Sequence, residues 1–331
     1  MIYVRADGNS RIGMGHVMRC LAISKELAAK GEQVTFIIAD DGASDFIEKS
    51  GYKCYVLGTE FTQMEAELPK LMDILPDKAK VLIDSYFVTE TYLKKVKEKC
   101  TVFYMDDLDA VPYPVDCVIN GNIYGGDIKY NVPMVLGGCE YAPLRREYVE
   151  ARAKTSPQYI LITTGSSDPY SITKKILEGI VMRPALMEKS IKIVCGRFNK
   201  DFEEIKAYEQ RYENIEVLQN VLDMWNLMSG AMLAVTAGGT TMNELSCMGV
   251  PVACFSFVDN QERIVSTYVE KGYAYYGGDY LKEGDEMIHY LCNSLEELVQ
   301  NEDLRKFYSD KASRLVDGLG SVRIAEAIIA F

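Results

Sequence analysis

The chain has 331 residues, more than the roughly 250 to 300 at which a single hydrophobic core usually stops growing, so we expect two domains. Its 48% hydrophobic and 25% charged residues are typical of a globular protein. No apolar run approaches the ~18 residues of a membrane span, so we expect no integral membrane contact. The net charge of −12 argues against a nucleic-acid-binding surface, which needs clustered Lys and Arg, although a small anion could still be bound locally by backbone N–H groups.

The N-terminus and the cysteines give an expectation for the cellular compartment. The sequence turns polar after Val4 and lacks the apolar stretch of a signal peptide, so we expect a cytoplasmic protein. The nine cysteines are an odd number, none has Cys-x-x-Cys spacing, and most lie in apolar segments. We therefore expect buried, reduced thiols rather than disulfides or metal ligands.

Short β-branched runs alternate with amphipathic segments in both halves of the chain, a pattern typical of parallel sheets with helices on both faces. In the first half we expect strands at residues 2–4, 34–38, 81–84 and 101–105, and helices beginning near His16, Asp45, Met64 and Thr89. In the second half we expect strands at residues 159–163, 191–195, 232–236 and 252–255, and helices beginning near Ser171, Val221, Thr241 and Asn260.

Between residues 111 and 148 this alternation gives way to a segment rich in Pro, Gly, Tyr and Asn, and a polar stretch follows at residues 150–157. We place the domain boundary there, with an N-terminal domain of residues 1–150 and a C-terminal domain of residues 151–331. Each half is then a Rossmann-like α/β domain. Because ligands of such open sheets bind beyond the carboxyl ends of the strands, we expect the two parallel sheets to face each other across a cleft.

The first candidate site follows the first expected strand directly. Residues 7–16 read Asp-Gly-Asn-Ser-Arg-Ile-Gly-Met-Gly-His and lead into an apolar-periodic helix. Gly13 and Gly15 allow close approach of the backbone to a ligand, and His16 falls where the positive end of the helix dipole favours a neutral imidazole, which can accept a proton from water. The alternative is a nucleotide loop whose histidine only caps a helix. The other histidine, His289, lies in a peripheral amphipathic segment, so His16 is the candidate base.

A second candidate site combines a strand end, a glycine turn and a helix start. Gly238 and Gly239 precede Thr240 and Thr241, whose hydroxyls and neighbouring N–H groups suit a diphosphate, and Glu244 lies one turn further, where it can accept hydrogen bonds from a ribose diol. The alternative is a Thr-capped helix with a capping-box glutamate. The residues alone leave both interpretations open.

Two further loops follow expected strands and supply small polar groups. One contains Gly165, Ser166 and Asp168, and the other contains Asn260 and Gln261. Each is either an ordinary turn or a part of the same ligand site.

The run at residues 106–109 contains the Asp-x-Asp spacing that can bind a divalent cation on a diphosphate. Helix N-termini and glycine loops already provide neutralisation for a diphosphate, and acidic turns after strands are common on surfaces. We therefore expect no metal and no other cofactor.

Taken together, these segments resemble the UDP-sugar hydrolases of pseudaminic acid biosynthesis and their spore-coat-polysaccharide relatives, over nearly the whole chain. These hydrolases remove UDP from UDP-2,4-diacetamido-2,4,6-trideoxy-β-L-altropyranose. The resemblance implies the GT-B fold, with two Rossmann-like domains. It rests on Arg5-Ala6-Asp7, Gly13-x-Gly15-His16-x-x-Arg19, Asp84-Ser85-Tyr86, Asp106-Asp107, the segment from Tyr141 to Tyr148, residues 165–168, Gly239-Thr240-Thr241 with Glu244, and Asn260-Gln261.

The resemblance also implies a mechanism. His16 would activate a water molecule for attack at the anomeric carbon, with inversion, with UDP as leaving group and without a metal. Residues 239–241 would contact the pyrophosphate, Glu244 the ribose, and Arg145 an anionic or acetamido group. The substrate-binding residues that the family pattern implies are Gly13, Gly15, Arg19, Asp84, Tyr86, Arg145, Gly165, Ser166, Asp168, Gly238, Gly239, Thr240, Thr241, Glu244, Asn260 and Gln261, the last two near the sugar or phosphate.

The chain departs from the family pattern in two loops, which leaves the sugar open. The family tends to read Gly-Gly-Ser-Asp where this chain has residues 164–168, and Asn-Pro-Asn where it has Asn-Gly-Asn at residues 120–122.

Three other functions share parts of this pattern. An inverting glycosyltransferase with a UDP-sugar donor would use nearly the same groups and differ in the nucleophile, and it is the main alternative. A non-catalytic nucleotide-sugar-binding protein would have no use for His16, and an epimerase of this fold would need more histidines than the two present. We therefore expect a UDP-sugar hydrolase, with its UDP-sugar and neighbouring pathway enzymes as candidate partners.

Overall fold

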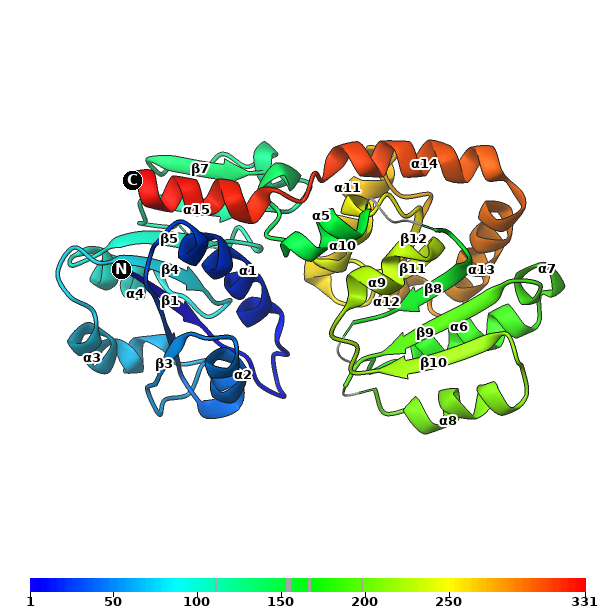
Figure 1. The fold of residues 1–331 in the computed structure, drawn as a ribbon, viewed down its shortest axis with the longest axis horizontal. Coiled ribbons are helices and arrows are strands. Elements are labelled where there is room, and N and C mark those ends of the chain that lie inside the picture. Colours follow the sequence, from blue (N-terminus) through cyan, green and yellow to red (C-terminus); the bar gives the residue numbers. More distant parts are fainter. Residues whose placement is uncertain (111, 153–155, 166–167, 198) are drawn as a thin grey trace. The chain divides into compact units, whose positions relative to one another are not determined.

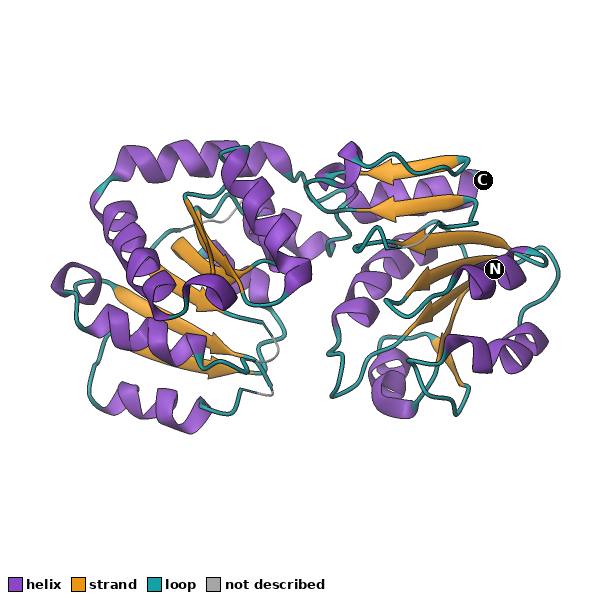
Figure 2. Ribbon diagram, turned by 180° about the vertical axis from the view of Figure 1, so that it is seen from behind, coloured by secondary structure: helices purple, strands orange, loops and turns teal. Residues whose placement is uncertain are grey.

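The computed structural model describes residues 1–331 except 111, 153–155, 166–167 and 198. The chain divides into two units, one of Met1–Arg145 with Gly318–Phe331 and one of Arg146–Asp317. Each unit is a parallel β-sheet covered by helices (Figures 1 and 2), so the predicted α/β class with two Rossmann-like domains is confirmed.

Unit 1 contains a seven-stranded sheet with the order β3-β2-β1-β4-β5-β6-β7, and every described pairing in it is parallel. Its elements are β1 (Ile2–Ala6), α1 (Gly15–Ala29), β2 (Val34–Ile38), α2 (Ser44–Lys49), β3 (Lys53–Val56), α3 (Met64–Ile74), β4 (Lys80–Asp84), α4 (Glu90–Lys97), β5 (Thr101–Met105), β6 (Cys117–Asn120), β7 (Met134–Gly137) and α15 (Gly320–Ala330).

The two faces of this sheet follow from the alternation of side chains along each strand. On β1, Ile2 and Val4 point into a core that they share with α1, α2 and α15, whereas Tyr3 points into the opposite core, beneath α3 and α4. On β4, Leu82 lies on the α1 side and Ile83 on the α4 side. This alternation also decides which way the polar residues at the strand ends point.

Unit 2 contains a six-stranded parallel sheet with the order β10-β9-β8-β11-β12-β13. Its elements are α5 (Arg146–Arg152), β8 (Tyr159–Thr163), α6 (Ile172–Val181), α7 (Pro184–Met187), β9 (Ser190–Cys195), α8 (Phe202–Lys206), β10 (Ile215–Gln219), α9 (Met224–Ser229), β11 (Ala231–Ala237), α10 (Thr241–Cys247), β12 (Val252–Ser256), α11 (Asp259–Glu270), β13 (Tyr276–Asp279), α12 (Tyr280–Glu283), α13 (Asp285–Gln300) and α14 (Glu302–Leu315).

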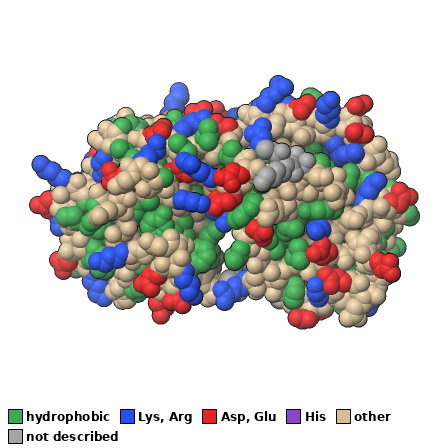
Figure 3. All heavy atoms as spheres, in the orientation of Figure 1, with side chains coloured by type: hydrophobic (Ala, Val, Ile, Leu, Met, Phe, Trp, Pro, Cys, Tyr) green, Lys and Arg blue, Asp and Glu red, His purple; other side chains and the backbone are tan. Residues whose placement is uncertain are grey.

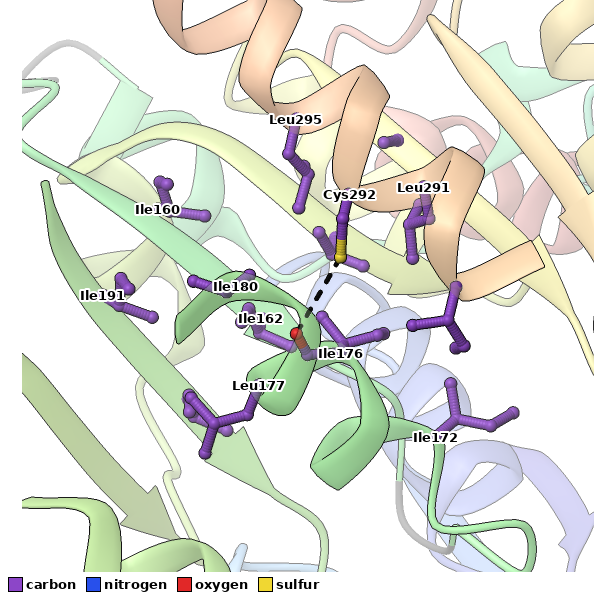
Figure 4. Close-up of a cluster of buried hydrophobic side chains, with 14 of the residues drawn as sticks. Ile160, Ile162, Ile172, Ile176, Leu177, Ile180, Ile191, Leu291, Cys292 and Leu295 are labelled. Atoms are coloured by element: carbon purple, nitrogen blue, oxygen red, sulfur yellow. Dashed lines mark hydrogen bonds between the residues drawn. The ribbon is translucent and has the colours of Figure 1, made fainter. Parts of the chain in front are cut away.

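The core on one face of the second sheet is dominated by isoleucine and leucine. Figure 4 shows Ile162 of β8 beside Ile176 of α6, and Ile160 of β8, Ile180 of α6 and Leu291 of α13 belong to the same cluster. The thiol of Cys292 lies in the same cluster and contacts the carbonyl of Ile176 at 3.9 Å. β-Branched residues on buried parallel strands and longer apolar side chains on the covering helices produce this packing.

All nine cysteines are free thiols, and eight of them are buried. Burial raises the pKa of the Cys292 thiol to about 11, the charge of Arg183 opposing the shift. Burial likewise raises the pKa of Cys54 to about 11. These thiols are therefore protonated near neutral pH, as the sequence analysis expected of buried, reduced cysteines.

The last helix differs from the sequence-based division at 150/151, which assigned residues 318–331 to the second half. In the structure α15 belongs to unit 1 and packs on α1, as Figure 1 shows in red. Ile324 and Ile328 are fully buried in the core beside β1, and the Lys80 ammonium donates hydrogen bonds to the carbonyls of Ile328 and Ile329. The apolar face of α15 and the hydrogen bonds of Lys80 to its last carbonyl groups explain why this helix packs on unit 1.

The expected elements of both halves are present, and five strands were missed: β3, β6, β7, β10 and β13. β6 and β7 lie in the segment rich in Pro and Gly, where composition obscures the periodicity. Helix starts agree to within one residue, except that α9 begins at Met224, three residues after the predicted Val221. Among the described residues, no helix combines the length and apolar character that a membrane span requires. Acidic and basic side chains are interspersed over the face drawn in Figure 3.

Candidate active site

The order of the first sheet places two loops side by side. β1 lies between β2 and β4, so the loop after β1 and the loop after β4 leave neighbouring strands at the point where the strand order reverses. In open α/β sheets this switch point is where ligands bind. The loop after β1 leads into His16 on α1, and β4 ends at Asp84.

His16 and Asp84 form a buried hydrogen-bonded pair. The Nδ1 atom of His16 lies 2.7 Å from the Asp84 Oδ1 atom. The Asp84 side chain is fully buried, and only 9% of the His16 side chain is exposed. Asp84 reaches the histidine because it follows Leu82 by two residues, and both therefore point toward α1.

Arg19 holds the same carboxylate one helical turn along α1. Its Nε donates to Oδ2 of Asp84 at 2.6 Å and its Nη2 to Oδ1 at 2.6 Å, a bidentate pair. Burial by itself would raise the pKa of Asp84, but the charges of Arg19 and His16 and the hydrogen bonds that they donate hold this pKa well below its ordinary value. Asp84 is therefore ionised and can only accept hydrogen bonds.

The ionised state of Asp84 fixes the tautomer of His16. A carboxylate at 2.7 Å from Nδ1 requires a proton on that nitrogen, because two acceptors at this distance would repel each other. The Arg19 Nη2 atom also lies 3.3 Å from Nδ1, but this is the longer contact. The second ring nitrogen, Nε2, then carries the lone pair and makes no hydrogen bond within the part of the chain that the structure describes. This is the arrangement that a general base needs.

Tyr86 and Asp107 complete the cluster. The Tyr86 ring meets the His16 ring edge-on, with centroids 4.5 Å apart, and its hydroxyl donates to Asp107 at 3.1 Å. Asp107 also pairs with the Nη1 atom of Arg19 at 2.7 Å. Burial and the charge of Asp107 raise the pKa of the Tyr86 hydroxyl, which therefore stays a hydrogen-bond donor near neutral pH.

The glycine loop before α1 is fixed by its own hydrogen bonds. Asn9 and Gly13 exchange backbone hydrogen bonds of 3.2 and 2.8 Å, and the Asn9 side chain donates to Asp40 at 2.8 Å. Gly13 has φ of +74°, which explains why glycine stands there. A side chain at Gly15 would meet nothing within 4 Å, so the start of α1 is open to a ligand.

The Arg5-Ala6-Asp7 segment has a structural role at this strand end. Arg5 is fully buried and forms a bidentate pair with Glu67 of α3 at 2.7 and 2.6 Å, and it also pairs with Asp7 at 2.6 Å. The Tyr92 hydroxyl donates to the same Glu67 at 2.8 Å. These contacts fasten α3 and α4 to the sheet on the face away from His16.

In the run at residues 106–109, the Asp-x-Asp pair is Asp107 and Asp109. The neighbours Asp106 and Asp107 point to opposite faces of the sheet. Asp106 accepts hydrogen bonds from the Tyr113 and Tyr130 hydroxyls and from the backbone N–H groups of Leu108 and Asp109. The oxygens of Asp107 face the cluster around Arg19. Both carboxylates thus have protein donors, and the described residues contain no group of three or more His, Cys, Asp or Glu side chains suited to a metal.

The second candidate site lies at the corresponding point of unit 2. The strand order reverses between β8 and β11, so the loop at Gly165 and the loop at residues 238–241 leave neighbouring strands, and the loop after β12 is next to them. Thr240 precedes α10 without a side-chain cap, so its hydroxyl is not used to cap the helix, and Thr241 and Glu244 occupy the first turn. Asn260 is exposed in the first turn of α11, and the side-chain oxygen Oε1 of Gln261 accepts a hydrogen bond from the backbone N–H of Phe257 at 3.1 Å.

Two predicted residues, Asp168 and Arg145, have other surroundings. Asp168 is buried and accepts the backbone N–H groups of Ile172 and Thr173 at 2.8 and 2.7 Å, so both its oxygens serve the start of α6. Ser166 lies outside the described residues. Arg145 belongs to unit 1 and lines a pocket of about 290 Å³ with Lys25, Tyr52 and other side chains of α1 and α2.

Sequence reasoning placed Asp107 in the resemblance and in a metal candidate, and did not predict Asp107, Asn122 or Tyr124 as residues of the site. The Asn122 amide donates to Asp107 Oδ1 at 2.9 Å, and the Tyr124 hydroxyl donates to its backbone carbonyl at 2.9 Å. The alternation of side chains along a strand could have indicated Asp107. Phe103 and Met105 face α1, so Asp107, two residues further, lies on the same side.

No family model matches the chain. The chain is 28% identical to the spore coat polysaccharide biosynthesis protein SpsG of Bacillus subtilis, over 96% of this chain and 95% of that one. It is 23% identical to the UDP-2,4-diacetamido-2,4,6-trideoxy-β-L-altropyranose hydrolase of Campylobacter jejuni, over 82% of this chain and 97% of that one.

Among solved structures, the chain is similar to MurG of Acinetobacter baumannii, with a TM-score of 0.70 and 17% identity over 100% of this chain and 99% of that one. Two parallel α/β domains and this likeness over the full length establish the fold. The chain has the GT-B fold.

Proposed function

We propose that this protein hydrolyses a UDP-sugar to UDP and the free sugar, with His16 as the general base. The sugar we propose is 2,4-diacetamido-2,4,6-trideoxy-β-L-altropyranose, because the C. jejuni hydrolase of that substrate aligns over 82% of this chain. The observation that carries the proposal is the hydrogen bond of 2.7 Å between His16 Nδ1 and the buried Asp84.

The pair is arranged for one proton transfer. Asp84 holds the Nδ1–H tautomer, so Nε2 can take a proton from water while the water oxygen attacks the anomeric carbon. The bond between that carbon and the phosphate oxygen breaks, and its electron pair leaves with UDP. Attack opposite the leaving group inverts the anomeric centre, and the imidazolium later returns its proton to solvent.

The charges of the cluster favour this step. Before the transfer, Arg19 carries one positive charge, and Asp84 and Asp107 carry one negative charge each. Their carboxylate oxygens lie 2.6 and 2.7 Å from guanidinium nitrogens of Arg19. The imidazolium that forms beside Asp84 then brings the group to neutrality. A buried site that becomes neutral as the reaction proceeds stabilises the protonated histidine without any movement of solvent.

For UDP we propose the loops at the switch point of unit 2. Gly239 and the hydroxyls of Thr240 and Thr241 would contact the diphosphate, and Glu244 would accept hydrogen bonds from the ribose. This is supported by the absence of a side-chain cap from Thr240, which leaves its hydroxyl available. Asn260 and Gln261 follow the neighbouring strand and would contact the sugar or the phosphates.

The test is UDP release without any acceptor. The natural chain, His16→Ala and the peripheral His289→Ala are compared on the diacetamido sugar nucleotide and on UDP-N-acetylglucosamine, with and without EDTA. We expect release from the first substrate, insensitivity to EDTA, and a loss of about 10²- to 10⁴-fold in His16→Ala. His289→Ala should match the natural chain, because His289 contacts only Arg183 and Asn293 on the surface of unit 2.

Two outcomes would contradict the proposal. Equal release by His16→Ala would remove His16 from the mechanism. No release from either substrate, together with UDP binding in calorimetry, would favour an inverting glycosyltransferase in which the same base deprotonates an acceptor hydroxyl.

A further inference from the structure

We propose that Asp107 is a positioning residue that acts on His16 through Arg19, by compensating the guanidinium charge and fixing its orientation. The inference rests on the proposed role of His16 as general base. Asp107 does not contact His16 in the structure, so its effect is transmitted by the arginine.

The contacts of Arg19 show how Asp107 can fix the orientation of the guanidinium. Its side chain is only 8% exposed. The guanidinium lies between two carboxylates, with Nε and Nη2 on Asp84 and Nη1 on Asp107 at 2.7 Å. A planar guanidinium with donors on both edges is fixed in plane by two such partners. If Asp107 were neutral, Arg19 would keep one charged partner and could rotate about that contact.

Asp107 is itself held in place. The Asn122 amide donates to one carboxylate oxygen at 2.9 Å, and the Tyr86 hydroxyl donates to the other at 3.1 Å. The Tyr124 hydroxyl donates to its backbone carbonyl at 2.9 Å. The loop after β6 therefore fixes the carboxylate, and the carboxylate fixes Arg19. The same carboxylate anchors the Tyr86 ring against the edge of His16.

The balance of charges around His16 shows how Asp107 can affect protonation of the imidazole. The Arg19 Nη2 atom lies 3.3 Å from His16 Nδ1, close enough to oppose a positive charge on the ring. Asp84 compensates one positive charge, so the pair of Arg19 and Asp84 alone would leave an imidazolium uncompensated in a buried site. Asp107 supplies the second negative charge. Its removal should therefore make protonation of His16 less favourable and slow proton transfer to Nε2.

Among the described residues, three ionisable side chains contact His16: Asp84 at the end of β4, Tyr86 after it, and Arg19 of α1. Two more contact these partners, Cys20 of α1 on Asp84 and Asp107 after β5 on Arg19. The Cys20 thiol and the Tyr86 hydroxyl stay neutral near pH 7, since burial raises the pKa of each, with the charge of Asp84 adding to the shift of Cys20 and that of Asp107 to the shift of Tyr86. The charge on His16 is thus set by Asp84, Arg19 and Asp107.

The first measurement needs no substrate. The chain has two histidines, so the ring nitrogens of His16 can be followed by ¹⁵N NMR across a pH titration, with His289 as an internal control. In Asp107→Asn we expect the titration curve of His16 to move to lower pH by about one unit, with the Nδ1–H tautomer retained. Asp107→Glu should restore the natural curve. The matched control is Asp109→Asn, which lies in the same acidic run at φ of +51°, a conformation that asparagine tolerates.

The second measurement is the rate of UDP release. We expect kcat of Asp107→Asn to fall about tenfold with KM unchanged, because both carboxylate oxygens are used by side chains of the protein. The acidic limb of the pH profile should move to lower pH with the NMR curve. Should Asp107→Asn fail to fold, as judged by the His289 signals and thermal melting, Asp107→Ser provides a second neutral variant.

The outcomes separate this inference from the proposed function. An unmoved His16 titration curve in Asp107→Asn would overturn the inference, whatever the kinetics. A moved curve with a natural chain that releases no UDP would leave the electrostatic role of Asp107 standing and would overturn the hydrolase proposal instead.

Discussion

His16 and Asp84 stand 68 positions apart in the sequence, and their side chains meet at 2.7 Å. The contact exists because β1 and β4 are neighbours at the switch point of the sheet, so that the helix following one strand starts beside the end of the other. Because Asp84 accepts a hydrogen bond from Nδ1–H, the imidazole of His16 has one defined tautomer, with its lone pair on Nε2.

Asp84→Asn should nearly abolish UDP release. Its side-chain NH₂ group can donate to Nδ1, which would stabilise the tautomer with the proton on Nε2 and leave no lone pair facing the substrate. We expect kcat to fall by about 10³- to 10⁴-fold with UDP binding unchanged. Initial rates and calorimetry check this, and the ¹⁵N shifts of His16 should report the exchanged tautomer. A rate within tenfold of the natural chain would show that Asp84 does not orient the base.

The stability of the same variant should depend on pH. Arg19 and His16 lower the pKa of Asp84 against the opposing effect of burial, so the folded state has the lower pKa and the unfolded chain the ordinary one. Such a carboxyl stabilises the fold above ~3.9 and loses this contribution as the pH falls below that value.

We therefore expect the Tm difference between the natural chain and Asp84→Asn to be largest near pH 7 and to shrink below pH ~4. Thermal melts followed by circular dichroism between these values check it. A difference that stays constant over the whole range would mean that Asp84 is not ionised in the folded state.

Much of the architecture could be predicted because the buried residues of most strands and helices also show the hydrophobic pattern of that element in the sequence. Strands such as β4 and β5 carry apolar runs, at residues 81–83 and 102–105, from which their class and, to within one residue, their bounds follow. β6 and β7 are short and follow segments rich in Pro and Gly. Their own sequence therefore indicates them weakly, and each is defined by its pairing with the preceding strand, β6 with β5 and β7 with β6. The sequence pattern of a segment cannot predict a strand that forms because the edge of a neighbouring strand is available for pairing.

The candidate site was predictable in its residues but not in its pairings. His16 stood out by its place at a helix start, whereas Arg19, Asp84 and Tyr86 came from the resemblance, and their contacts depend on the order of strands in the sheet. Asp107 shows the limit well. Its neighbour Asp106 has the same chemistry, and only the side of the sheet on which each lies makes one a partner of Arg19 and the other an acceptor for tyrosines.

Glu67→Gln should destabilise unit 1 strongly. Burial disfavours the charge on Arg5, and its pKa is nevertheless raised because Glu67 and Asp7 pair with it, so neutralising Glu67 leaves a buried arginine partly uncompensated. We expect a loss of about 3 to 5 kcal/mol in the free energy of unfolding, measured in urea. The control is Glu98→Gln, which breaks an exposed pair with Lys95 and should cost under ~1 kcal/mol. Equal effects in the two variants would contradict a structural role for the buried pair.

Gly238 and Gly239 are adjacent, and alanine at each should have a different effect. A Cβ at Gly238 would lie 2.5 Å from a methyl carbon of Val265 and 2.9 Å from the backbone carbonyl oxygen of Gln261, so Gly238→Ala must displace α11 and lower Tm. A Cβ at Gly239 would meet nothing within 4 Å, so Gly239→Ala should fold with an unchanged Tm. Because the proposed diphosphate site lies at Gly239, we expect that variant to weaken UDP binding about tenfold or more in calorimetry. Natural affinity in a well-folded Gly239→Ala protein would move the diphosphate away from this loop, since the added methyl group fills the space that the phosphates would need.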